Sequence, residues 1–354
     1  MLYTGIDLHK KYSVACTQDT TGQCVREARI DHADPEALRS YFVSLGQESR
    51  VVIEACWNWG WLHDQLNELD EVSDVTVVHP AKTRIIAEAQ IKTDRIDARA
   101  LCHLLRTDLV ARIHIPTAEA RSRKYVLRQR LFFVRMRTML RNRVHAVVDR
   151  QRGLQRPVCS DLFGVKGLAW LRRLDLPGSD GMLLKESLTM LDTIALQVKE
   201  LERCIAEEMG DCELMQRLCS MPGLGPVLAA VVAIELDGIE RFRSPAKLCA
   251  YAGLVPTTHA SGGKVYHGRL LPFCNRYLRW AFIEAAWTAV GYDGYFGTLY
   301  SSHSARGKKA NVAITIVARR LCQIAWHLLH EHRDYQPGPA KHLLTFSPAA
   351  PALT

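Results

Sequence analysis

The sequence lacks the cysteine spacing of a zinc site or of a disulfide framework. It has eleven cysteines, an odd number, and none of them form a Cys-x-x-Cys pair. Cysteines scattered singly along a long chain, such as Cys16 and Cys249, are typical of small buried apolar side chains in a reducing compartment. The sequence therefore predicts free and mostly buried thiols.

Long apolar segments are also missing. No stretch approaches the roughly 18 consecutive apolar residues of a membrane span, and residues 1–7 lack the basic and then apolar pattern of a signal peptide. A hydrophobic content of 48% and a charged content of 23% in 354 residues are typical of a soluble protein with room for two domains. We therefore expect a cytoplasmic protein without a membrane partner.

Acidic residues are scarce in the middle of the chain. Residues 121–152 contain eleven Arg or Lys residues and a single acid, Asp149, within a formal net charge of +9 for the whole protein. A helix surface that is merely solvated would carry interspersed acids, so the pattern favours phosphate contacts over that alternative. Charge alone does not separate DNA from RNA. The candidate contacts are Arg128, Arg135, Arg137, Arg141 and Arg143.

Short apolar and β-branched runs dominate the first third of the sequence. Turn residues separate the first three runs, which predicts a three-stranded meander. Later strands alternate with helices, and this order predicts a mixed sheet covered by helices. The predicted strands are 3–8, 12–17, 24–30, 51–55 and 75–78, and the predicted helices are 34–45, 57–69 and 92–105.

Four carboxylates in this region form the most specific pattern. Asp7 and Glu54 each interrupt an apolar strand run, and buried carboxylates are rare unless they are paired or bind metal. Asp94 and Asp97 lie three residues apart on a predicted helix, so both project from one face. That pair alone is more typical of an ion-paired surface. Together, the four acids suit two Mg²⁺ ions, which Mn²⁺ could replace, that bind phosphate oxygens.

The second half of the chain is predicted to be mainly helical. A basic helix covers residues 117–155, and proline and glycine interrupt the chain between 157 and 178. A near-heptad seam between 184 and 205 then indicates either a short coiled coil or packing within one chain. The segment Met221-Pro222-Gly223-Leu224-Gly225-Pro226 predicts a turn between two helices. It would be either a simple turn or a phosphate cradle built from the N–H groups at Gly223 and Gly225.

Two further segments carry candidate phosphate ligands. Glycines follow Ser261 and would let the backbone approach a large ligand closely, while Lys264 could neutralise a phosphate. A lone Ser-Gly-Gly is usually structural, and no His-Asp relay accompanies it. Lys308 and Lys309 precede an apolar helix at 312–329, which predicts a phosphate-binding helix start.

The acidic segments resemble a known family. Gly5-Ile6-Asp7-Leu8-His9-Lys10, Ile53-Glu54-Ala55-Cys56 and Lys92-Thr93-Asp94-Arg95-Ile96-Asp97-Ala98 are similar to the three acidic blocks of the DEDD transposases of insertion sequences. Members of that family are DNA recombinases guided by a structured noncoding RNA, the bridge RNA. The resemblance implies an α/β RNase H-like (RuvC-like) domain in which Asp7, Glu54, Asp94 and Asp97 bind the metal ions.

The resemblance extends over residues 3–333. Pro222-Gly223-Leu224-Gly225, Tyr251-Ala252-Gly253-Leu254 and Asn275-Arg276-Tyr277-Leu278-Arg279 are similar to the family's transposase domain, which has a helix-hairpin-helix-like turn and supplies a serine nucleophile. This similarity implies Ser261 as the nucleophile, with Arg276 and Arg279 among the DNA contacts. It also implies a homodimer that assembles into a tetramer on donor and target DNA.

These observations predict a transposase or site-specific recombinase. A RuvC-like nuclease of the Holliday-junction type would need the acids but not Ser261, and a non-catalytic nucleic-acid-binding protein would need neither. The predicted domains are 1–155 (acids and basic helix), 156–210 (linker and coiled-coil-like helix), 211–335 (transposase domain) and 336–354 (disordered tail).

Overall fold

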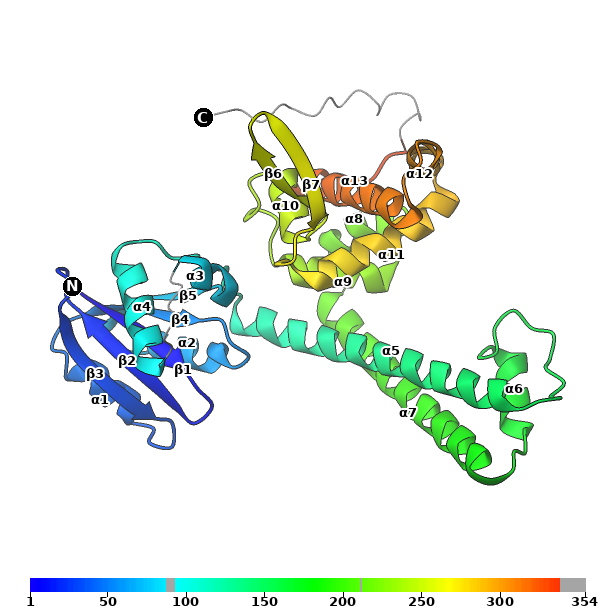
Figure 1. Ribbon diagram of the computed structural model, residues 1–354, viewed down its shortest axis with the longest axis horizontal. Helices are drawn as coiled ribbons and strands as arrows, with labels where there is room; N and C mark the ends of the chain where they lie inside the picture. Colours follow the sequence, from blue (N-terminus) through cyan, green and yellow to red (C-terminus); the bar gives the residue numbers. More distant parts are fainter. Residues whose placement is uncertain (87–92, 211, 338–354) are drawn as a thin grey trace. The chain divides into compact units, whose positions relative to one another are not determined.

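The computed structural model describes residues 1–86, 93–210 and 212–337 (Figure 1). The chain forms two compact units, Met1–Ala118 and Glu119–Thr354, and each is described by itself. This division differs from the predicted boundary at residue 155. Lys92 of the third acidic segment lies outside the described residues, as does the predicted tail from residue 338 onward.

The first unit is built on a five-stranded mixed sheet, as the sequence predicts. The strand order is β3-β2-β1-β4-β5; β2 is antiparallel to β1 and β3, whereas β4 is parallel to β1 and β5. Val51, Val52 and Ile53 are fully buried because helices cover both faces of β4. The strands are β1 (Leu2–Leu8), β2 (Tyr12–Gln18), β3 (Cys24–Asp31), β4 (Ser49–Glu54) and β5 (Val72–Val78).

Helices cover the sheet from two sides. Helices α1 and α2 pack on one face through Phe42 and Leu62, and α4 packs on the other across β1 and β2. A Cβ atom on Gly5 would lie 2.2 Å from the Ala98 carbonyl oxygen, so only glycine allows α4 to approach β1 this closely. The helices are α1 (Ala37–Val43), α2 (Trp59–Asn67), α3 (Pro80–Ile86) and α4 (Asp94–Arg106).

Helix α1 begins later than predicted. The sequence suggested a helix start at Asp34, but the Asp34 carboxylate accepts a hydrogen bond from the Glu36 backbone N–H and closes a turn instead. An Asp side chain that bonds its own backbone two residues on competes with helix formation, which explains the shift.

The second unit begins with two long antiparallel helices, α5 (Ala118–Arg150) and α7 (Gly178–Met209). Arg130 of α5 pairs with Glu202 near one end of α7, and Arg150 pairs with Asp180 near the other end. The heptad seam of α7 is largely buried within the chain, so packing in one chain accounts for much of that pattern.

Helix α6 (Val165–Arg173) lies in the segment predicted to be broken by glycine and proline. Gly164 is its N-cap residue, and Gly167 packs against the Leu162 carbonyl oxygen, which a Cβ atom would approach to 2.1 Å. These glycines therefore start and pack a helix rather than interrupt one.

The rest of the second unit has a helical core, as the sequence predicts. It also contains one β-hairpin that the sequence analysis did not predict. The apolar helix α13 is the one helix among the described residues that is long and apolar enough to cross a membrane, and it packs against α10 and α11 in the core. The elements are α8 (Glu213–Ser220), α9 (Pro226–Leu236), α10 (Pro245–Tyr251), β6 (Pro256–Ser261), β7 (Lys264–Leu270), α11 (Arg276–Tyr292), α12 (Gly294–Ala305) and α13 (Ala310–His330).

Candidate functional site

The four predicted acids lie on neighbouring elements of the first unit. Asp7 is near the carboxyl end of β1 and Glu54 is the last residue of β4; the strands pair in parallel with Ile6 beside Ile53, so the two acids follow at the same edge. Asp94 and Asp97 occupy the first turn of α4, where the positive end of the helix dipole stabilises carboxylates. We call these four residues the acid cluster.

Two residues that the sequence analysis did not single out join the acid cluster. The Nε2 atom of His9 lies 3.0 Å from Oδ2 of Asp7 and 3.3 Å from Oδ2 of Asp94. The hydroxyl of Tyr12 donates a hydrogen bond to the same Asp94 oxygen over 3.1 Å, and its ring stacks on His9. The Arg29 guanidinium lies 3.7 Å from the centre of the Tyr12 ring. The alternation Asp7-x-His9 at a strand end was the available sequence signal, because residues two apart share a face.

The surroundings of Asp7 in the acid cluster disfavour its ionised form. Partial burial raises the pKa of Asp7 above its ordinary value, and the negative charges of Asp94 and Asp97 raise it further. The hydrogen bond and the charge of His9 act in the opposite direction without reversing the shift. Burial is therefore the main reason that the ionised form of Asp7 is disfavoured.

This arrangement fits a hard divalent cation. One ligand atom from each of Asp7, His9 and Asp94 lies within 4.8 Å of the other two. Carboxylate oxygens are the ligands that Mg²⁺ and Mn²⁺ prefer, and a cation would offset the charge that raises the pKa of Asp7. The chemistry of the donor set thus matches the predicted metal.

The predicted phosphate contacts on α5 fall into two groups, and the first is engaged within the protein. Arg128 donates two hydrogen bonds, of 2.9 and 3.0 Å, to Glu235 of α9, whose side chain is only 1% exposed. The same guanidinium lies over the Tyr277 ring. The acids missing from the local sequence of α5 are therefore supplied in part by distant helices.

The second group is more accessible. Arg135 and Arg143 are exposed, whereas Arg141 lies over the Phe163 ring and Arg137 is half-buried. Desolvation, followed by the positive charges of Arg141 and Arg130, lowers the pKa of Arg137. A bound anion would stabilise the charged form of Arg137 and reduce the repulsion between these arginines. These residues therefore remain candidate phosphate contacts.

Ser261 lies at the tip of an exposed β-hairpin in the second unit. It ends β6 and pairs with Lys264, which begins β7. Gly262 and Gly263 form the two-residue turn with φ values of +56° and +74°. Both values are positive, as in the type I′ turns that favour glycine, so turn geometry explains the two glycines. The serine is exposed to solvent at the end of a β-strand rather than in an irregular loop.

Arg279 supports the base of this hairpin. Its guanidinium donates a hydrogen bond to the carbonyl of Leu271, and it lies so close to Gly253 that a Cβ atom there would be 2.2 Å from its Nη2 atom. Arg276, by contrast, is exposed at the first position of α11. Arg276 thus remains available to a ligand, whereas Arg279 has a structural role.

The predicted turn between helices joins α8 to α9. Gly223 has a φ of +84°, and a Cβ atom there would lie 2.1 Å from the Ala285 carbonyl oxygen of α11, so this glycine is required for packing. Gly225 is exposed and is the N-cap residue of α9. Lys308 and Lys309 are also exposed, and Lys309 is the N-cap residue of α13. A helix start with exposed cations is suited to phosphate binding.

Comparisons with known proteins indicate which class of protein this chain resembles. A family model described as a transposase, of the DEDD type of IS110, matches residues 4–151, and a model described as "Transposase IS116/IS110/IS902 family" matches residues 215–301. The first match includes the whole acid cluster, and the second includes Ser261. The protein is therefore a DNA transposase.

Relatives with the same description cover nearly the whole chain. A protein of Pseudomonas aeruginosa described as a probable family 20 transposase is 28% identical over 94% of this chain and 98% of its own length. The transposase for insertion sequence element IS1328 of Yersinia enterocolitica is 24% identical over 91% of this chain and 95% of its own length. Both family models thus describe transposases, and relatives described as transposases align with nearly the whole chain.

Proposed function

We propose that the protein cleaves and rejoins donor and target DNA strands with the acid cluster and Ser261 acting on the same phosphodiester. The observation that carries this proposal is the convergence of Asp7 and Asp94 on His9, where burial raises the pKa of Asp7. The proposal also assigns the mixed sheet of the first unit to the RNase H-like (RuvC-like) class and the α8–α9 turn to the helix-hairpin-helix class. It keeps domain boundaries at 155, 210 and 335.

In this mechanism the acid cluster binds and orients the divalent metal. Asp7, Glu54, Asp94 and Asp97 would hold it through carboxylate oxygens, and His9 and Tyr12 orient Asp7 and Asp94 through hydrogen bonds. Bound Mg²⁺ would act as a Lewis acid on the scissile phosphate and stabilise its developing charge.

Ser261 is the nucleophile in this mechanism. Its Oγ atom forms a bond to phosphorus, the bond between phosphorus and the 3′ oxygen breaks, and the serine proton ends on the released 3′-hydroxyl. A serine hydroxyl is a weak nucleophile that needs activation, which explains why a serine mechanism would retain the acids. Lys264, which pairs with Ser261 across the turn, is placed to neutralise a phosphate next to it.

The partners follow from the resemblance and from the exposed surface. A structured noncoding RNA would choose target and donor DNA, while exposed cations such as Arg135 and Arg143 contact backbone phosphates without reading sequence. Exposed apolar side chains on α5 and α7, including Phe132, Met139 and Leu196, support association of protomers into a dimer and then a tetramer. The protein would act in the cytoplasm.

Trapping the covalent intermediate tests the role of Ser261. Wild-type protein should form a denaturation-resistant adduct on a DNA substrate that traps the intermediate, with the nucleotide remnant on the peptide that contains Ser261. Ser261→Ala should lose both adduct and recombination while still binding DNA, because a methyl group cannot attack phosphorus. Ser301→Ala, at an exposed serine of α12, is the matched control and should behave as wild type.

Persistent cleavage by Ser261→Ala without any adduct would overturn the serine mechanism and favour the nuclease alternative, in which a water attacks. Guidance by RNA has its own test, which is sequencing the RNA that copurifies with the protein. A single structured RNA is expected, and a random sample of cellular RNA would contradict the proposal.

A further inference from the structure

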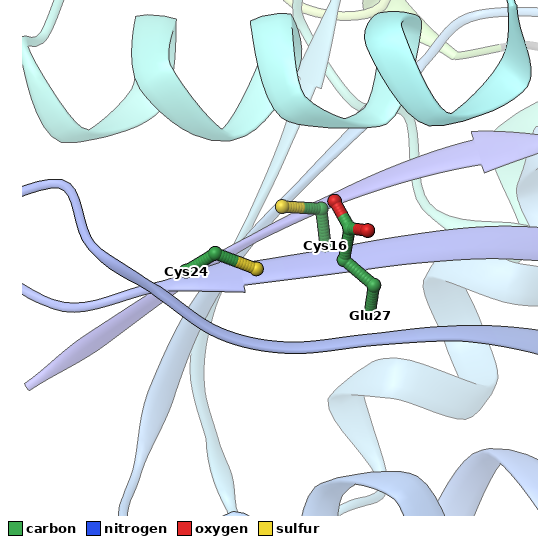
Figure 2. Close-up of side chains that lie close together, drawn as sticks. All are labelled: Cys16, Cys24 and Glu27. Carbon is green, nitrogen blue, oxygen red and sulfur yellow. The ribbon is translucent and has the colours of Figure 1, made fainter.

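Two cysteines and a glutamate of neighbouring strands come together beneath α4. Cys16 is buried in β2, Cys24 is exposed at the start of β3, and Glu27 follows on the same strand. Figure 2 shows both sulfur atoms and the Glu27 carboxylate gathered beneath a helix. One ligand atom from each of the three residues lies within 4.8 Å of the other two.

Cys102 brings a third thiol to this group from α4. The helix crosses β1 at Gly5, where a Cβ atom would lie 2.5 Å from the Cys102 nitrogen, and Gly5 pairs with Cys16 on the neighbouring strand. The Cys102 thiol donates a hydrogen bond to the Tyr3 carbonyl over 2.9 Å, and Cys16 interacts electrostatically with Cys102, Cys24 and Glu27. Cys16 is therefore the centre of a group with ligands from β2, β3 and α4.

The donor set is that of a thiophilic metal. Zinc binds thiolates at about 2.3 Å in a tetrahedron, which places two sulfur ligands about 3.8 Å apart, so atoms already within 4.8 Å need only small side-chain rotations. Soft thiolates select zinc and disfavour Mg²⁺, whereas the oxygens of the acid cluster do the reverse. Three thiolates and a carboxylate would make a closed site of the structural kind.

Arg99 offsets the charge of such a site. Its guanidinium forms an ion pair with Glu27, and it stands one turn before Cys102 on α4. A zinc ion with three thiolates and one carboxylate has a net charge of about −2, which a neighbouring guanidinium reduces.

We propose that Cys16, Cys24, Cys102 and Glu27 form a structural zinc site that fastens α4 to β2 and β3. The site lies on the same helix as Asp94 and Asp97, whose first turn it would help to hold in place. The cysteines are free, as the sequence predicts, and Cys16 and Cys102 are buried. Cys24 is exposed rather than buried.

Cobalt substitution tests the proposal in the full-length protein. Metal-free, reduced protein titrated with Co²⁺ should develop a thiolate-to-cobalt charge-transfer band with one ion per chain, and Zn²⁺ should abolish the band. Cys24→Ser removes an exposed sulfur, so the fold should survive while Co²⁺ affinity falls at least about tenfold. Cys219→Ser, at an exposed cysteine of α8, is the matched control and should keep the band.

Two further variants separate this site from the acid cluster. Asp7→Asn should leave the charge-transfer band intact because oxygen ligands do not produce it. Zinc should raise the unfolding temperature of wild type and of Cys219→Ser, but not that of Cys24→Ser combined with Cys102→Ala. The proposal is overturned if no thiolate band forms, if the band is unchanged in Cys24→Ser, or if Cys16 and Cys24 form a disulfide while zinc is in excess.

Discussion

The acid cluster and helix α5 both stand out in the sequence by charge of one sign, yet the structure treats their charges differently. In the acid cluster, the aspartates face one another around a single imidazole, and the pKa of Asp7 is raised. On α5, Arg128 meets a buried glutamate and Arg130 meets Glu202. A run of charge therefore indicates a ligand only where the fold leaves that charge uncompensated.

This difference has a physical origin. A buried anion such as Glu235 is too costly to leave unpaired, so the fold places a guanidinium beside it. In the acid cluster, Asp7 and Asp94 contact His9, Asp94 also accepts a hydrogen bond from Tyr12, and burial disfavours the ionised form of Asp7, which a bound cation would stabilise. The following predictions test whether compensated and uncompensated charges have separate roles.

The largest effect is expected for Asp97→Asn. Removing one carboxylate of the acid cluster should lower DNA strand cleavage by at least about a thousandfold, because metal ions stabilise the transition state by several kcal/mol. DNA binding should persist, because a negatively charged carboxylate does not attract the phosphates of DNA. Cleavage and filter-binding assays in Mg²⁺ measure both properties. Asp70→Asn, at an exposed acid of the same unit, is the control, and full cleavage by Asp97→Asn would refute the metal site.

A smaller effect on stability should distinguish two arginines of α5. Arg128→Gln leaves Glu235 buried without its ion pair and should lower the free energy of unfolding by about 2 kcal/mol, less than for a fully buried pair because Arg128 is 40% exposed. Arg143→Gln should leave stability unchanged. Denaturant titration of both variants measures the difference.

The same two variants should differ in the salt dependence of their DNA affinity. Arg143→Gln should reduce the slope of log affinity against log salt by about one if Arg143 contacts a phosphate, whereas properly folded Arg128→Gln should keep the wild-type slope. Replacing Arg135, Arg137, Arg141 and Arg143 together should flatten the slope further. An unchanged slope in the fourfold variant would make this helix a solvated surface.

Local patterns predicted the sheet and the four acids, because strand alternation and the Asp-x-x-Asp spacing are short-range features. The partners of the α5 arginines could not be predicted in the same way. Glu202 and Glu235 lie far along the chain, and only the packing of α7 and α9 brings them to α5. The hairpin that carries Ser261 was missed because Gly262 and Gly263 were interpreted as residues that let the backbone approach a ligand closely. In the structure they form the two-residue turn of the hairpin.

The pH dependence of stability gives the smallest effect and the most direct measure of uncompensated charge. The pKa of Asp7 in the folded protein is raised above 3.8, so the folded state binds this proton more tightly than the unfolded state does. Asp7 therefore contributes stability at low pH that is lost as the pH rises through its raised folded value. Asp7→Asn has no such loss and keeps an acceptor for His9, so without metal its stability relative to wild type should increase with pH over that window and then level off.

Thermal unfolding of the two proteins in a chelating buffer, from acidic to neutral pH, measures this difference. Mg²⁺ should then stabilise wild type above that window, where Asp7 is ionised, and should have little effect on Asp7→Asn, because ligands that bind only the folded state raise its stability. A stability difference that stays constant with pH would mean that Asp7 is fully compensated by His9. The acid cluster would then resemble the ion pairs of α5, and the distinction between the two regions would fail.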